Sequence, residues 1–70
     1  MVEVFKTNVQ QHEQADQLAS VLRGRFDFCK INFDLEDCDK ILRVEGKQVC
    51  VETIIEILKT HGLQCEVLPD

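Results

Sequence analysis

The stretch KINFDLEDCDKILRVEG, residues 30–46, decides the fold. Its apolar residues alternate with polar ones on both sides of a polar turn: Ile31, Phe33 and Leu35 before it, and Leu42 and Val44 after it. Strict alternation is typical of strands with one buried and one wet face. The turn EDCD, residues 36–39, joins the two runs, and Gly46 ends the second. The stretch therefore predicts a β-hairpin.

A strand and a helix are predicted before the hairpin. The β-prone run VEVF, residues 2–5, is followed by Thr7 and Asn8, which signal a helix start. Asn8 with Gln11 three residues on resembles a capping box. Apolar residues then recur at helical spacing until Gly24: Ala15, Leu18, Val21 and Leu22. The pattern predicts a helix over residues 10–23.

A second helix and a last strand follow the hairpin. The helix has an apolar stripe made of Val51, Ile54, Ile55 and Leu58. Gly62 stands where a left-handed cap belongs, after Lys59 and His61. The run LQCEVL, residues 63–68, predicts a strand with Leu63, Cys65 and Val67 on one side.

The resulting order, βαββαβ, predicts an α+β protein with the ferredoxin-like fold. Right-handed crossovers give one four-stranded antiparallel sheet with both helices on one face, in a single domain over residues 1–70. His12, Cys38 and His61 then share one end of the sandwich, and Cys29 and Cys50 lie near the other. The register of the first strand stays undetermined, because Val2 and Val4 alternate one way and Phe5 the other.

Composition narrows the functional class. The chain has 70 residues and a net charge of −5, so its surface repels a phosphate backbone and nucleic acid is not expected as a partner. No apolar run approaches the roughly 20 residues that span a bilayer, and the N-terminus lacks the pattern of a signal peptide. We therefore expect a cytoplasmic protein without a membrane partner, with its four cysteines as free thiols.

The apolar pattern resembles that of the heavy-metal-associated domain family, which includes small copper chaperones. Those domains carry Met-x-Cys-x-x-Cys at the start of the first helix, with apolar residues four, seven and eight positions after the second cysteine. With Val9 on the methionine, those apolar positions are filled by Leu18, Val21 and Leu22. The late pattern of the family matches IIEILKTHGLQCEV, residues 54–67. The resemblance implies the ferredoxin-like fold over nearly the whole chain.

The same alignment puts Gln11 and Gln14 on the two metal-binding cysteines of the family. Two thiolates clamp a soft ion such as Cu(I), whereas glutamine carbonyls are hard, weak donors. In this alignment the spacing of the Cys-x-x-Cys motif is kept, and its two cysteine ligands are replaced by glutamines. We therefore expect a degenerate metal loop and no bound cofactor.

Residual metal binding is the alternative. His12 and His61, completed by Glu13 or a glutamine, or by a thiol from a second subunit, form a hypothetical Zn(II) or Cu(II) site. A calcium loop in DLEDCDKILRVE, residues 34–45, is excluded, because its sixth position is Asp39 instead of glycine and strands flank it.

Catalytic patterns are missing from the sequence. It shows no serine–histidine or cysteine–histidine pair and no glycine-rich phosphate loop, so an enzyme is not expected. Cys50 near the start of the second helix is a candidate reactive thiol, but no second cysteine lies two or three residues away to resolve a redox reaction. The strand ILRVEG, residues 41–46, offers no aromatic residue on which RNA bases stack.

The open face of the sheet is the predicted interaction surface. Ile41, Leu68 and Phe5 are expected among polar residues there, and exposed apolar groups on a sheet are candidates for association. The sequence thus predicts a non-enzymatic protein-interaction or self-association module, with a protein partner or a second copy bound at this face.

Overall fold

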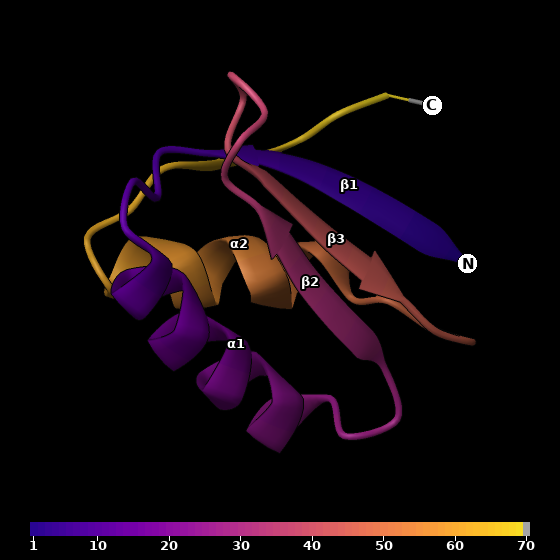
Figure 1. The fold of residues 1–70 in the computed structure, drawn as a ribbon. Coiled ribbons are helices and arrows are strands. Elements are labelled where there is room, and N and C mark those ends of the chain that lie inside the picture. Colours follow the sequence, from indigo (N-terminus) through magenta and orange to yellow (C-terminus); the bar gives the residue numbers. More distant parts are fainter. Residues whose placement is uncertain (70) are drawn as a thin grey trace.

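The computed structural model describes residues 1–69 and has the predicted βαββαβ order. The elements are β1 (Val2–Thr7), α1 (His12–Arg25), β2 (Lys30–Asp34), β3 (Ile41–Glu45), α2 (Val51–Thr60) and β4 (Cys65–Val67). The strands form one antiparallel sheet in the order β2-β3-β1-β4, and both helices lie on the same face of it (Figure 1). The ferredoxin-like sandwich is confirmed. Within residues 1–69, no helix is long and apolar enough to cross a membrane.

Strand pairing determines the register of β1. Phe5 lies opposite Leu42 of β3, and Leu42 lies opposite Phe33 of β2. Directly paired residues project to the same face of a sheet. Phe5 therefore faces the helices with the predicted hairpin core, whereas Val4 projects to the open face opposite Arg43.

The prediction that Phe5 stands on the open face is therefore wrong. Its side chain is fully buried. The physical reason is its place in the helix-facing row of the central strand, where a large ring fills the space between sheet and helices. Burial of such a ring gains roughly 1.5–3 kcal/mol compared with leaving it in water.

The core has two parts. The larger cluster joins the sheet to both helices, and its most deeply buried members are Phe5, Leu22, Leu42, Val44, Ile54 and Leu58. The smaller cluster lies beneath the start of α1 and contains Val9, Ala15, Leu18 and Leu35. Half-buried Phe33 packs against both clusters. The predicted core positions Leu18 and Phe33 thus lie on the helix-facing side, and the smaller cluster anchors the loop before α1.

Helix α1 begins and ends two residues later than the predicted range of 10–23. Asn8 is not its N-cap. Gln11 has that position, with extended backbone and no capping side-chain hydrogen bond. At the other end Gly24 does not stop the helix, because two further helical residues bring the C-cap residue Phe26 into the core, where only 9% of it is exposed. That burial outweighs the cost of about 1 kcal/mol for glycine in a helix.

The end of α2 is as predicted. Gly62 has φ = 78°, the left-handed conformation that favours glycine. Its N–H donates to the carbonyl of Lys59, and the N–H of Leu63 donates to the carbonyl of Leu58. These bonds satisfy carbonyls that the end of a helix leaves unpaired. The chain then turns sharply into β4.

Candidate functional site

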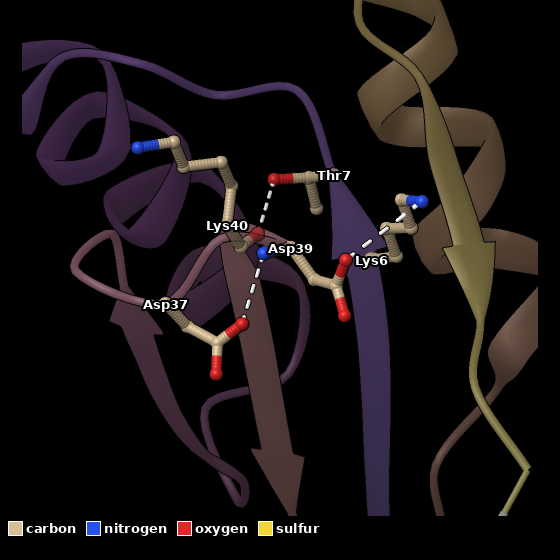
Figure 2. Close-up of polar contacts among 5 residues, drawn as sticks. All are labelled: Lys6, Thr7, Asp37, Asp39 and Lys40. Carbon is tan, nitrogen blue, oxygen red and sulfur yellow. Dashed lines mark hydrogen bonds and ion pairs between the residues drawn. The ribbon is translucent and has the colours of Figure 1, made fainter.

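Three connections meet at one end of the sandwich, as the topology predicts. The N–H of Thr7 donates to the carbonyl of Asp39 at 3.1 Å, and its hydroxyl donates to the carbonyl of Lys40 at 2.6 Å (Figure 2). The side-chain oxygen of Asn8 accepts a hydrogen bond from the N–H of Gln64 at 2.9 Å. The β1–α1 loop is thus tied to both the β2–β3 turn and the α2–β4 connection.

The loop before α1 is anchored on its inner side. Val9 is fully buried, and its N–H donates to the hydroxyl oxygen of Thr7 at 3.2 Å. The carbonyl of Gln11 accepts the first α1 hydrogen bond, from Ala15, at 3.0 Å. Gln11 is exposed and Gln14 is half-buried. Gln11 and Gln14, which the sequence resemblance aligns with metal-binding cysteines, therefore stand at the helix start, on a loop that is held in place.

The surface around this helix start is rich in amides. A shallow depression there is lined by Gln10, Gln11, Glu13, Gln14 and Gln17. Amide oxygens are neutral, hard donors, and a single carboxylate adds one charge. Within residues 1–69 the free cysteines are Cys29, Cys38, Cys50 and Cys65, and none of them lies in the loop. The depression therefore offers amide oxygens and one carboxylate, but no thiolate.

The proposed histidine ligands come from different helices. His12 and Glu13 are exposed in the first turn of α1, and His61 is exposed at the C-cap of α2. The Nδ1 atom of His61 lies 2.8 Å from the carbonyl oxygen of Ile57, so in the tautomer that donates there Nε2 faces away. His61 lines a depression together with Gln14. In the described part of the chain, no three-ligand cluster contains His12, Glu13 or His61.

The β2–β3 turn, in which the sequence excludes a calcium loop, gathers acidic groups. Ligand atoms of Asp37, Cys38 and Asp39 lie within 4.8 Å of one another. One carboxylate oxygen of Asp37 accepts the N–H of Asp39 at 2.9 Å, and the carboxylate of Asp39 lies 3.7 Å from the ammonium group of Lys6 (Figure 2). The sequence signal was the repetition of aspartates at 34, 37 and 39. That repetition did not indicate that Lys6 of β1 would pair with Asp39.

The open face of the sheet carries a groove of about 500 Å³. Ile41 and Leu68, both predicted for an interaction surface, line it and are half-buried. Val4 of β1 joins them, whereas Phe5 points to the other face. Val4 could be assigned to this face only after the strand register was known.

Two thiols differ in their acidity. The thiol of Cys50 is exposed. Its pKa is lowered by a hydrogen bond with the Thr53 hydroxyl, at 2.9 Å, and by a hydrogen bond with the Thr53 backbone. Burial raises the pKa of the Cys65 thiol from 9.0 to about 11, against a smaller lowering effect of Lys59. Cys50 is therefore the more reactive of the two, and Cys65 is a core residue.

The burial of Cys65 predicts a loss of stability in alkaline solution. The unfolded chain releases this proton near pH 9 and the folded chain near pH 11. The protonated Cys65 thiol therefore contributes to the free energy of unfolding fully below pH 9. This contribution, at most about 3 kcal/mol, is lost as the pH rises from 9 to 11. Urea unfolding of the reduced protein at several pH values measures it. A Cys65→Ala variant should lose less stability over the same range, and an equal loss in both chains would contradict the prediction.

The fold and the loop define a ferredoxin-like domain with an amide-lined helix start. Neither a known protein-family model nor a curated protein matches the chain. Among solved structures it is similar to the yeast copper transporter domain Ccc2a, whose solution structure is known in apo and Cu(I)-loaded states. That similarity has a TM-score of 0.81 and 20% sequence identity, and covers 99% of this chain and 96% of the other. At this identity, the likeness establishes the fold.

Proposed function

We propose that this chain is a non-enzymatic protein-interaction domain of the heavy-metal-associated type, in which the metal loop has lost its thiolate chemistry. The observation that carries the proposal is the pair Gln11 and Gln14 at the helix start. The loop around them is held by Thr7 and buried Val9. An anchored loop without soft ligands supports loss of metal binding with retention of the fold.

The interaction role is supported by the uncovered sheet face. Both helices pack on the other face, so the groove that contains Ile41 and Leu68 is free in the isolated chain (Figure 1). Half-buried apolar side chains beside charged ones are typical of the surfaces that proteins use to bind one another. The partner is a different protein or a second copy.

Residual binding of zinc or copper is the second candidate. It is favoured by the position of His61, which lines one depression together with Gln14. Its Nε2 atom is available when Nδ1 donates to Ile57. His12 and Glu13 would complete the site after side-chain movement, since imidazole and carboxylate groups suit Zn(II) and Cu(II).

A metal titration followed by amide NMR separates the two candidates. The reduced chain is titrated with Cu(I), Zn(II) and Cu(II) in turn, in competition with a chelator of known affinity. We expect no stoichiometric shifts over residues 9–14. Stoichiometric shifts confined to that loop and His61 would contradict the proposal and support the second candidate. A His61→Ala variant is the matched control, because it should abolish such shifts only when His61 is a ligand.

A further inference from the structure

We infer that the groove on the open sheet face binds a partner segment that carries lysine or arginine beside apolar side chains. The inference rests on the proposed interaction function and names the chemistry of the partner. It follows from the apolar floor of the groove, from the charges at its rim, and from the poor match between two copies of the groove.

The floor of the groove includes three apolar residues that come from distant parts of the chain. Val4 of β1 and Ile41 of β3 project from the open face, and Leu68 follows β4. The N–H of Leu68 donates to the carbonyl of Val4 at 2.8 Å, which holds the two residues together. All three are half-buried. A partner's aliphatic side chains would remove the rest of their surface from water.

The rim of the groove is acidic. Asp34, Asp37 and Asp39 line the groove, and within residues 1–69 the one basic residue that lines it is Arg43, which lies opposite Val4. Asp34 and Asp37 each use a carboxylate oxygen to accept a backbone N–H, from Glu36 and Asp39 respectively. These bonds order the carboxylates without neutralising them. The rim therefore has a surplus of negative charge that favours a cationic side chain.

The ion pair between Lys6 and Asp39 does not cancel this surplus. Lys6 and Asp39 are 3.7 Å apart, and their side chains are 53% and 41% exposed. Exposed pairs of this kind are weak and are screened by salt. A lysine or arginine of a partner can therefore replace Lys6 at Asp39, and can reach Asp34 and Asp37 without competition from it.

A second copy of the chain fits the groove poorly. In a symmetric dimer through this face, each groove would meet another with the same three aspartates and a single arginine. The chain as a whole has a net charge of −5, which adds repulsion between copies. Charge complementarity thus favours a basic segment of a different protein.

Selection from a displayed library of random peptides tests the inference, because it assumes no partner. The purified, reduced chain is the bait, with EDTA present to remove divalent cations. We expect the selected peptides to be enriched in lysine or arginine next to valine, isoleucine or leucine. In amide NMR they should shift Val4, the residues 41–43 and Leu68.

Matched charge variants make the test specific. The triple variant Asp34→Asn, Asp37→Asn and Asp39→Asn removes three charges and keeps the side-chain oxygens that accept backbone hydrogen bonds. It should bind the selected peptides about tenfold more weakly or worse. The control variant Asp16→Asn, Asp27→Asn and Glu56→Gln also removes three charges, all from exposed positions outside the groove, and should bind as the original chain does.

Several results would overturn the inference. They are a failure to select any peptide, selected peptides without basic enrichment, NMR shifts outside the groove, or equal weakening in the two charge variants. Neutral apolar peptides that shift the groove residues would refute the basic partner and leave the interaction function standing. Failure of the proposed function itself has a different signature, stoichiometric metal binding at residues 9–14.

Discussion

A chain in which Gln11 and Gln14 are both replaced by cysteine should bind one Cu(I) ion in the presence of a chelator that strips the original chain. The helix start and the anchored loop are already in place, and the two replacements supply a pair of thiolates there. Four-ligand zinc sites gain roughly 10–16 kcal/mol. Two added thiolates therefore contribute on the order of 5 kcal/mol, or more than about a thousandfold in affinity. Competition titration under reducing conditions measures the gain.

The control places two cysteines on the same surface at a different spacing. Gln10 and Gln17 line the same depression but stand seven residues apart. The variant Gln10→Cys with Gln17→Cys should show no comparable gain, because its thiols do not share one helix turn. Equal Cu(I) affinity in both double variants would refute the idea that this loop keeps the geometry of a metal site.

Replacing Phe5 with alanine should destabilise the fold by about 3–5 kcal/mol. The ring is fully buried in the row of β1 that faces the helices, and its removal leaves a cavity next to Leu42. Because small domains are stable by only about 5–15 kcal/mol, this single change removes much of the total. Urea denaturation followed by circular dichroism measures the free energy of unfolding.

Two valines on opposite faces of the sheet test which residues of the sheet face the helices. Val44 is fully buried on the helix side, and Val4 is half-buried on the open face. Val44→Ala should cost about 2 kcal/mol, from two lost methyl groups and the cavity they leave, and Val4→Ala less than about 1 kcal/mol. Equal costs at the two positions would show that the register of β1 is misassigned.

Local signals in the sequence were sufficient to predict most of the helices and strands. Alternation over residues 30–46 predicted the hairpin, and Gly62 predicted the end of α2. Both features depend on residues close in sequence. The hairpin follows from the two-residue side-chain period of a strand, and the helix end follows from the backbone freedom of glycine. Gly24 was misleading because the burial of Phe26, a tertiary contact, outweighed the local cost of glycine in a helix.

The candidate site was also predictable only in part from the sequence. Gln11 and Gln14 were selected because the resemblance to heavy-metal-associated domains aligns them with metal-binding cysteines, and the structure places them at the start of α1. The groove could not be identified in this way. Its acidic rim is local to the β2–β3 turn, but Val4 and Leu68 come from opposite ends of the chain and meet it only through the sheet order.

The sequence by itself determined the order of elements, the hairpin and the presence of Gln11 and Gln14 three residues apart near the predicted helix start. The tertiary structure alone decided which face Phe5 and Val4 occupy, because VEVF has apolar residues on both sides and its period is ambiguous. A register is set by hydrogen bonds between strands far apart in sequence, and a shift of one residue moves every side chain to the other face. That long-range pairing buried Phe5 in the core and left Val4 in the groove.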